Sequence, residues 1–135
     1  MSADTNLSIA RRFFYECWNQ GKLDVLDEIM APNHVHHLPD EDIHGIDAIK
    51  AGIRTMRIAF PDKTLTIDDE IAAQDKVVFR WTSRFTHLGD FFGMPPTGNH
   101  IEYSGIDIIR IKDDRIVELW SQWNQFSFKR QLNPS

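Results

Sequence analysis

The sequence predicts an α+β fold, because the spacing of its apolar residues changes near Pro61. Before Pro61 the apolar residues recur every three or four positions, as on one face of a helix. After Pro61 they alternate with polar residues, as in strands with one buried face. With 135 residues and 41% hydrophobic content, the chain can bury one core but not two. We therefore expect one domain over residues 1–135, with helices covering one face of a long, curled antiparallel sheet.

Three helices are expected in the first half, over residues 7–20, 23–30 and 47–60. Gly21 follows the first pattern and suits the C-cap position of a helix. Pro32 closes the second pattern. The third has Asp47 as its expected N-cap and Pro61 as its stop.

Four strands are expected in the second half, over residues 65–71, 77–85, 101–112 and 115–126. Asp113 and Asp114 suit a two-residue hairpin turn between the last two strands. This turn fixes the register of the hairpin, since it places Lys112 opposite Arg115 and every earlier pair follows by counting back along both strands.

The register assigns polar and aromatic side chains of the last two strands to one face, which we expect to line the interior. This face carries Tyr103, Asp107, Trp120, Gln122 and Asn124. The opposite face is also largely apolar and carries Ile106, Ile108, Leu119, Ser121 and Trp123. Because an apolar outer face favours contact with a second subunit, we expect a homodimer or a higher homo-oligomer.

The composition excludes several classes of partner. Fifteen Lys and Arg against twenty Asp and Glu give a net charge of −5, and neither sign forms a block. We expect no nucleic-acid partner, because nucleic acid requires a basic face. The first residues are polar and no apolar run approaches the roughly eighteen residues of a membrane span, so we expect a cytoplasmic protein without membrane contact. Cys17, the one cysteine, is expected to be a buried and inert thiol.

The segment from Thr86 to Gly98 is the most informative part of the chain. Its two prolines and three glycines exclude a helix and a central strand, so it is a shaped loop between two strands. The loop carries His87, Phe91 and Phe92. Because such loops often line binding sites, we expect a ligand pocket beside it.

Asp107 is the carboxylate on the expected inner face of the sheet. If it lies among aromatic rings without a cationic partner, burial raises its pKa and makes it a candidate acid or base. The alternative is a structural salt bridge to Arg80 or Arg110, since buried carboxylates are usually paired.

Histidines offer two further candidates. A neutral His87 could donate to a substrate carbonyl or shuttle a proton, or its ring could bond the loop backbone. His34 and His36 would project from one side of a strand, as chelating pairs do, whereas His37 points the other way. No carboxylate or cysteine is placed to complete a zinc shell around this cluster and the nearby His44, so we expect no metal.

Large rings are frequent for a small domain, and each can belong either to the core or to a pocket wall. The rings in question are Trp18, Trp81, Phe91, Phe92, Tyr103 and Trp120. The polar groups of Gln122 and Asn124 on the same expected face favour a pocket, because inward polar groups need partners. We therefore expect these rings to bind a flat, hydrophobic small molecule.

From Ser8 to Leu132 the sequence resembles the SnoaL-like polyketide (ester) cyclases of the NTF2-like superfamily. The matching motifs are Phe14–Gly21, Ala59–Asp62, Gly93–Gly98, Gly105–Arg110 and Arg115–Trp120. The resemblance implies a cone-shaped barrel, in which a curved antiparallel sheet wraps around the N-terminal helices and encloses a deep apolar pocket. It also implies an intramolecular aldol condensation that needs neither metal nor cofactor. Of the clustered histidines, it implies that His37 alone faces the cavity.

The chain departs from the family pattern Trp-x-x-x-Asp, because Trp120 is followed at the fourth position by Asn124. An amide cannot accept a proton from carbon at neutral pH, so Asn124 is expected to polarise a substrate oxygen. Asp107 or His87 would then move the proton, while Tyr103, Gln122 and His37 help to hold the oxygens. Two alternatives stay open: a non-catalytic binding protein of the same fold, favoured by Asn124, and a purely structural dimerisation domain.

Overall fold

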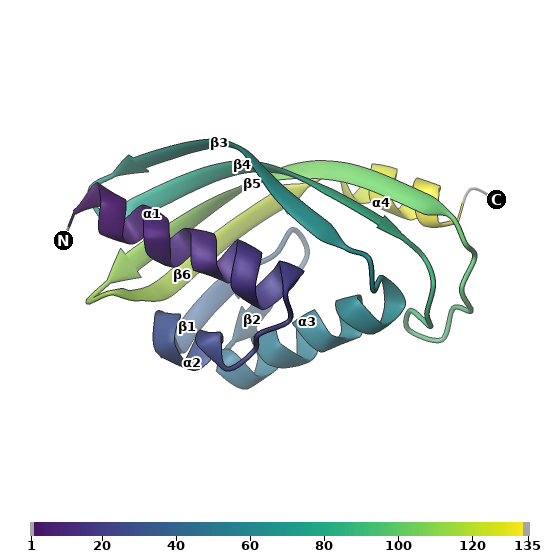
Figure 1. Cartoon of the computed structure of the whole chain (residues 1–135), viewed down its shortest axis with the longest axis horizontal. Coiled ribbons are helices and arrows are strands. Elements are labelled where there is room, and N and C mark those ends of the chain that lie inside the picture. Colours follow the sequence, from purple (N-terminus) through teal and green to yellow (C-terminus); the bar gives the residue numbers. More distant parts are fainter. Residues whose placement is uncertain (1, 134–135) are drawn as a thin grey trace.

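The fold is an α+β arrangement in which a curved sheet arches over helices, as predicted (Figure 1). The protein is described by a computed structural model of residues 2–133. Its helices are α1 (Ala3–Arg12), the π-helix η1 (Phe13–Asn19), α2 (Val25–Ile29), α3 (Ile46–Ala59) and α4 (Gln125–Leu132). Its strands are β1 (Met30–His37), β2 (Asp42–His44), β3 (Thr64–Ala73), β4 (Lys76–Thr86), β5 (His100–Lys112) and β6 (Arg115–Trp123).

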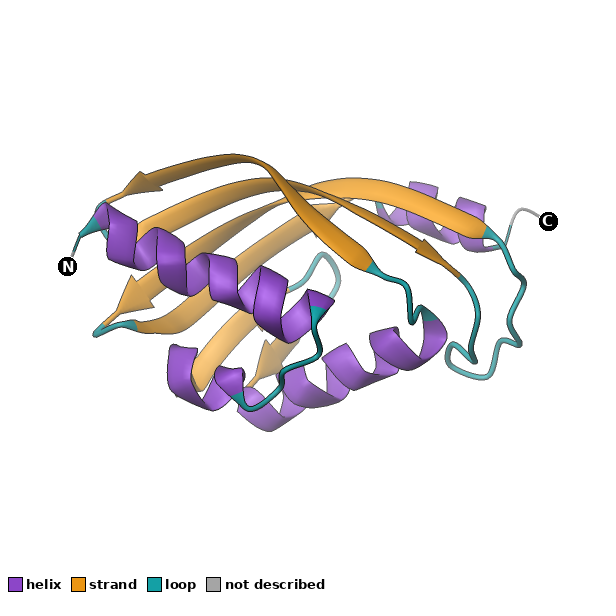
Figure 2. Cartoon of the chain, in the orientation of Figure 1, coloured by secondary structure: helices purple, strands orange, loops and turns teal. Residues whose placement is uncertain are grey.

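Within residues 2–133 the six strands form one sheet in the order β2-β1-β6-β5-β4-β3 (Figure 2). The sheet is open, since β2 and β3 lie at its two edges and do not pair with each other. The cone-shaped barrel that the family resemblance implied is thus built from a curved sheet whose two edge strands do not pair. Its pairs are antiparallel except for β1 and β6, which run parallel.

The helices agree with the sequence patterns over most of their length. The first predicted helix corresponds to α1 followed without a break by η1. Gly21 ends it with φ near +70°, and the N–H of Lys22 donates to the Glu16 carbonyl at 2.9 Å. The third begins earlier than expected, because Gly45 and not Asp47 is the N-cap of α3. The second ends early, since Met30 already belongs to strand β1.

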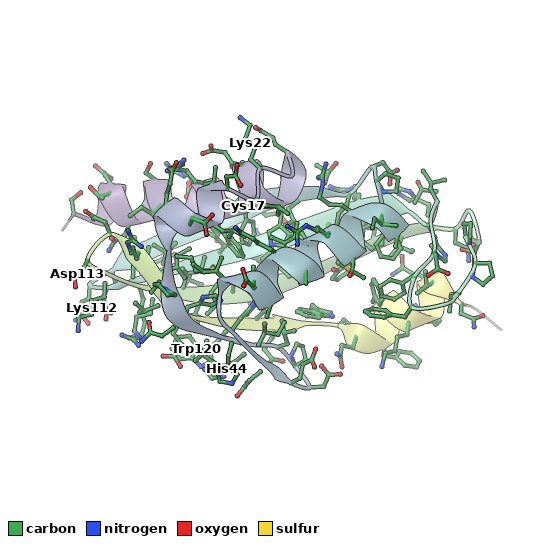
Figure 3. The ribbon with its side chains drawn as sticks, turned by 90° about the horizontal axis from the view of Figure 1, so that it is seen from below. Cys17, Lys22, His44, Lys112, Asp113 and Trp120 are labelled. Carbon is green, nitrogen blue, oxygen red and sulfur yellow. The ribbon has the colours of Figure 1, made fainter. Side chains whose placement is uncertain are left out.

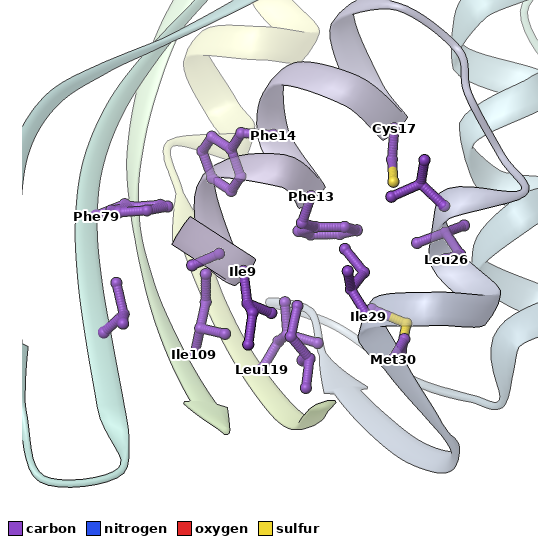
Figure 4. Packing of buried hydrophobic residues seen from close by; sticks show 14 of the residues in the cluster. Ile9, Phe13, Phe14, Cys17, Leu26, Ile29, Met30, Phe79, Ile109 and Leu119 are labelled. Atoms are coloured by element: carbon purple, nitrogen blue, oxygen red, sulfur yellow. The ribbon is translucent and has the colours of Figure 1, made fainter. Parts of the chain in front are cut away.

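The main core lies between the π-helix η1, helix α2 and the inner face of the sheet (Figure 4). Phe13 and Phe14 are buried there, and the ring of Phe14 meets Phe79 of β4 edge to face at 5.1 Å between centroids. Cys17 is buried in the same cluster as a free thiol, and burial raises its pKa. The thiol is thus held in its unreactive protonated form.

The hairpin between β5 and β6 has the predicted turn but not the predicted register. Asp113 and Asp114 both have positive φ, as a type I′ turn requires, and Lys112 pairs with Arg115. Two positions further on, Val117 has no partner, because the register shifts by one residue at this bulge. Since side chains alternate with a period of two, one extra residue exchanges the two faces of the rest of β6.

The predicted assignment of side chains to the two faces of β6 is therefore wrong. Asp107 pairs with Ser121 and not with Trp120, so Ser121 faces inward and Trp120 and Gln122 face outward. The outer face also carries Ile106, which is 50% exposed, beside charged side chains. It is less apolar than expected, and the homodimer stays a prediction. None of the helices in residues 2–133 combines the length and the apolar content that crossing a membrane would need.

Candidate active site

A cavity of about 640 Å³ lies between the inner face of the sheet and helix α3. The elements around it are η1, α3, α4, all six strands of the sheet and the loop between β4 and β5. Most of its wall is apolar and aromatic. The polar side chains of the wall that are also buried are His36, Lys63, Asp107 and Ser121.

The structure brings together some of the predicted site residues and excludes others. Those that line the cavity are Trp18, Trp81, Phe91, Phe92, Tyr103 and Asp107. Those that lie outside its wall are His37, His87, Trp120, Gln122 and Asn124. Trp120 and Gln122 lie outside because of the register of β6, which was predicted wrongly. The alternation expected along the histidine strand holds, and it turns His36 inward and His37 outward.

Asp107 is buried, and no charged side chain of residues 2–133 pairs with it. It is only 5% exposed, and its carboxylate accepts hydrogen bonds from the indole N–H of Trp81 at 3.0 Å and from Ser121. The salt bridge considered from the sequence is absent among residues 2–133, since Arg110 pairs with Glu118 and Arg80 with Asp68. Burial raises the pKa of Asp107 to about 6, and the two neutral hydrogen bonds oppose this shift only in part.

Gly105 makes room for the indole that holds Asp107. It pairs with Trp81 across β4 and β5, and a Cβ atom at Gly105 would lie 2.5 Å from a ring carbon of that indole. Any larger residue at this position would displace the ring and with it the N–H that bonds Asp107. The glycine of the motif Gly105–Arg110 is thus part of the construction of the site.

His36 continues the polar chain from Asp107 along the wall. Its Nε2 atom lies 2.7 Å from the Ser121 hydroxyl, and burial lowers the pKa of His36 to about 4, so the ring is neutral. When Asp107 is ionised, Ser121 must donate to the carboxylate and accept from His36. The ring then carries its proton on Nε2, which leaves the buried and unpartnered Nδ1 as an acceptor.

His37 faces away from the cavity, contrary to what the resemblance implied. Its ring stacks on outward-facing Trp120 at 5.4 Å, and its nitrogens lie 2.8 Å from the Asp42 carboxylate and 2.7 Å from the Glu118 carboxylate. These two partners, Glu118 first, raise the pKa of His37. Figure 3 shows Trp120 at the side of the molecule remote from Cys17. Alternation along β1 gives the inward position to His36, one residue earlier.

His87 organises the loop and does not reach the cavity wall. It is buried, its Nδ1 atom accepts from the backbone N–H of Thr97 at 3.2 Å, and the Thr97 hydroxyl lies 3.0 Å from the same nitrogen. Its ring also packs against Phe60 at 5.6 Å. This geometry corresponds to the alternative in which the histidine bonds the loop backbone. Phe91 and the 81% exposed Phe92 of this loop line the cavity, as predicted from its shape.

Asn124 caps a helix that the sequence analysis did not predict. Strand β6 ends at Trp123, and the side-chain oxygen of Asn124 accepts from the N–H of Ser127 at 2.9 Å at the start of α4. Asn and Asp are equally good at this position. The departure from the family's Trp-x-x-x-Asp pattern therefore leaves the local structure intact and removes no base from the cavity wall.

Lys63 is the functional candidate that sequence reasoning missed. It is 6% exposed, and its Nζ atom donates to the Ser83 hydroxyl at 2.6 Å. Burial lowers the pKa of Lys63 to about 7. A signal was present, since Lys63 directly precedes β3 in phase with inward-facing Leu65, and Ser83 shares the inner face of β4 with Trp81.

The histidine cluster does not form a metal centre. Residues 2–133 contain no group of three or more His, Cys, Asp or Glu side chains arranged to hold an ion. His34 is buried and its Nδ1 bonds the Ala31 carbonyl at 3.0 Å, whereas His44 is exposed. His34 and His36 are thus buried side chains.

Comparisons with known proteins agree on one family. Residues 8–132 match the family model of the SnoaL-like polyketide cyclases. The aklanonic acid methyl ester cyclase DauD of Streptomyces sp. (strain C5) is 28% identical over 118 residues, which cover 82% of this chain and 70% of DauD. The crystal structure of IdmH, a proposed polyketide cyclase from Streptomyces antibioticus, is 31% identical with a TM-score of 0.82 and covers 94% of this chain and 97% of its own.

The fold is shared more widely than the sequence. The crystal structure of a proposed SnoaL-like polyketide cyclase from Jannaschia sp. CCS1 superposes with a TM-score of 0.89 at 20% identity, covering 98% of this chain and 94% of its own. At that identity the likeness concerns the fold alone. The motifs quoted from the sequence and the match over residues 8–132 carry the family relationship.

Proposed function

The chain belongs to the SnoaL-like polyketide cyclase family, and on that premise we propose that it closes a ring in a hydrophobic, oxygenated small molecule by an intramolecular aldol reaction without a cofactor. Asp107 is the catalytic base of this proposal. The observation that carries it is a buried carboxylate that faces an apolar cavity and has only neutral hydrogen-bond donors. Isomerisation through the same enolate is the related reaction that this base could also support.

The carboxylate has the properties that proton abstraction from carbon requires. Its pKa of about 6 leaves it ionised at neutral pH and yet close enough to neutrality to hold a proton during the reaction. Asp107 would take a proton from the carbon between two carbonyl groups, the resulting carbanion would attack a second carbonyl, and the proton would return to the new alkoxide. Trp81 and Ser121 keep the carboxylate in position throughout.

The cavity wall supports a polycyclic or aromatic ligand. Rings of Trp18, Trp81 and Tyr103 lie along it, and a cavity of about 640 Å³ has the size of a site for a multi-ring molecule. Burial raises the pKa of Tyr103, so its phenol stays protonated and can donate to a developing enolate oxygen. The polar groups are few, as expected for a site that selects by shape and hydrophobicity.

The test is turnover of a polyketide ester. Aklanonic acid methyl ester, named as the substrate of the relative DauD, serves as the probe, and the cyclised isomer is separated by liquid chromatography and mass spectrometry. Asp107→Asn should lower kcat/KM by roughly 10²-fold or more, the usual contribution of a general base. Asp69→Asn, which alters an exposed carboxylate on β3, is the matched control and should leave the rate unchanged. Equal rates for wild type and Asp107→Asn would remove Asp107 from the mechanism.

The second candidate is a non-catalytic binding protein of the same shape. One observation favours it: Gln122 and Asn124, expected from the sequence to hold substrate oxygens, both lie outside the cavity wall. This alternative predicts that the wild type binds the probe ester without converting it and that Asp107→Asn binds with the same affinity. Fluorescence quenching of the cavity tryptophans measures both affinities.

A further inference from the structure

We propose that Lys63 is a second reactive group of the cavity, an amine nucleophile that condenses with an aldehyde or ketone carbonyl of the ligand to form a Schiff base. The inference deepens the proposed function and rests on it, since both require a carbonyl ligand in the same cavity. Nothing in the family match assigns a role to this lysine. The geometry around its amine distinguishes it from the other lysines of the chain.

The amine of Lys63 is enclosed, and the described part of the chain supplies it with no counterion. Lys63 lies just before β3, and its Nζ atom donates to Ser83 at 2.6 Å inside the molecule. Within residues 2–133 no carboxylate lies within ion-pair distance of it, since the neighbouring Asp62 accepts instead from the N–H of Thr86 at 2.8 Å. Lys50, by contrast, donates to the Asp27 carboxylate at 2.9 Å. Lys63 thus has the burial of a core residue without the ion pair that stabilises a buried charge.

Three aromatic rings surround the amine. Its Nζ atom lies 4.7 Å from the ring centre of Phe85, 5.3 Å from that of Tyr103 and 5.6 Å from that of Trp18. The apolar surroundings favour the neutral amine, whose lone pair is the nucleophile. The same ring faces attract a cation, so they stabilise an iminium ion once it has formed. The site therefore suits both the free amine and its covalent product.

The condensation balances without an oxidant or a reductant. The lone pair of Nζ attacks the carbonyl carbon, a C–N bond forms, and one proton moves from nitrogen to oxygen to give a carbinolamine. A second proton, taken from water, lets that oxygen leave as water and leaves the iminium ion on Lys63. The iminium withdraws electrons from the adjacent carbon, whose proton then passes to the Asp107 carboxylate.

The enamine formed in this way would carry out the ring closure. Its carbon attacks a second carbonyl of the same ligand, which restores an iminium and gives an alkoxide that takes the proton back from Asp107. Hydrolysis by water then returns the free amine of Lys63. Lys63 and Asp107 both contribute to the cavity wall, and both contact the pair of packed rings formed by Trp81 and Tyr103. The lysine therefore supplies an electron sink and the aspartate a base for one carbon acid.

The test is selective labelling of the intact protein at neutral pH. Benzaldehyde with sodium cyanoborohydride converts a Schiff base into a stable secondary amine, and peptide mass mapping locates it. At pH 7 about half of the Lys63 amine is neutral, against about one part in 2,500 for an ordinary lysine. Lys63 should therefore be labelled at least about tenfold faster than any exposed lysine. Tyr103 is the titratable side chain in direct contact, and it stays neutral over this range.

Two variants complete the design. Lys63→Met keeps the apolar stem and should fold normally, as judged by circular dichroism, but should lose the fast label. Lys112→Met, which removes an exposed lysine beside the hairpin turn, should keep it. Uniform labelling of surface lysines, fast labelling that persists in Lys63→Met, or a Lys63 rate that rises only near pH 10 would each overturn the proposal.

The outcome is separable from that of the proposed function. Asp107→Asn should lose cyclisation and still form the Lys63 adduct, because the first condensation needs no carbon base. Cyclisation that depends on Asp107 but proceeds at the wild-type rate in Lys63→Met would leave the aldol function standing and remove the Schiff base from it.

Discussion

Two side-chain clusters, each containing a carboxylate and a histidine, lie on opposite faces of strands β1, β5 and β6. They differ in burial and in charge. On the inner face Asp107 connects through Ser121 to His36, enclosed by the aromatic wall. On the outer face Glu118 bonds His37 at 2.7 Å and Arg110 at 3.1 Å, within reach of solvent. The residue types are nearly the same in both groups, but only the outer one contains ion pairs.

The difference shows that burial, and not residue type, sets the chemistry. On the inner face burial raises the pKa of Asp107 and lowers that of His36. Both shifts favour the uncharged form of the side chain. On the outer face His37 and Glu118 each hold the other in its charged form, so the pKa of His37 rises and that of Glu118 falls. The inner group is suited to proton transfer, whereas the outer group joins β1 to β6.

The largest expected effect is on the inner face, in the pH dependence of the difference in unfolding free energy between Asp107→Asn and wild type. Asp107 has a folded pKa of about 6, above its value of about 3.9 in an unfolded chain, so its contribution is fully present below pH 4 and is lost as the pH rises through 6. The lost contribution is about 3 kcal/mol. Urea unfolding should therefore find Asp107→Asn more stable than wild type at pH 8 by up to that amount, and equally stable at pH 4.

The control for this measurement is Glu118→Gln on the outer face. Because the folded pKa of Glu118 is lowered, its contribution is present above about pH 4.5 and is lost as the pH falls, so this variant should be less stable than wild type at neutral pH. A wild-type protein that exceeds Asp107→Asn in stability at pH 8 would show that Asp107 has an ionic partner.

A smaller effect is expected from His37→Gln. The raised pKa of His37 makes its ion pairs stabilising below about pH 6.5, with the gain lost as the pH rises through the folded pKa. Acid protonates Glu118, so the loss in the variant should be greatest between about pH 4.5 and 6.5 and should stay below about 1 kcal/mol after solvent screening. Thermal unfolding in low and high salt measures it, and an effect that salt leaves unchanged would contradict the ionic account.

The smallest effect is expected from Asn124→Asp. Both residues cap helices well, so stability should change by less than about 0.5 kcal/mol, whereas Asn124→Ala should lose about 1 kcal/mol with the bond to Ser127. The rate of ring closure should be unaffected, because position 124 lies outside the cavity wall. A gain in cyclisation on introducing Asp would place this position in the active site after all.

Features set by local interactions could be predicted from the sequence. The turn at Asp113 and Asp114 and the helix end at Gly21 depend on neighbouring residues, and both are as expected. The burial of Asp107 without a salt bridge was one of two alternatives drawn from its aromatic surroundings. The structure decides between them because Arg80 and Arg110 have partners of their own on the outer face.

Features that depend on a single inserted residue could not be predicted. The bulge at Val117 leaves no mark in a period-two pattern, yet it moves Trp120 and Gln122 out of the interior and brings Ser121 in.

Two other features were missed for different reasons. Helix α4 was missed because Phe126 and Phe128 continue the alternation of the preceding strand. Lys63 was overlooked because a lysine is usually exposed, and its burial depends on rings from distant parts of the chain.

The central claim is that Asp107 is a buried carboxylate whose partners are all neutral. Carbon-13 NMR titration of the aspartate carboxyl groups, with Asp107 assigned by comparison with Asp107→Asn, measures its pKa directly. The account predicts a midpoint near pH 6, about two units above the ordinary value of an aspartate side chain. A midpoint at or below about 4 would contradict it, because only a cation or full hydration could hold the carboxylate in its charged form there.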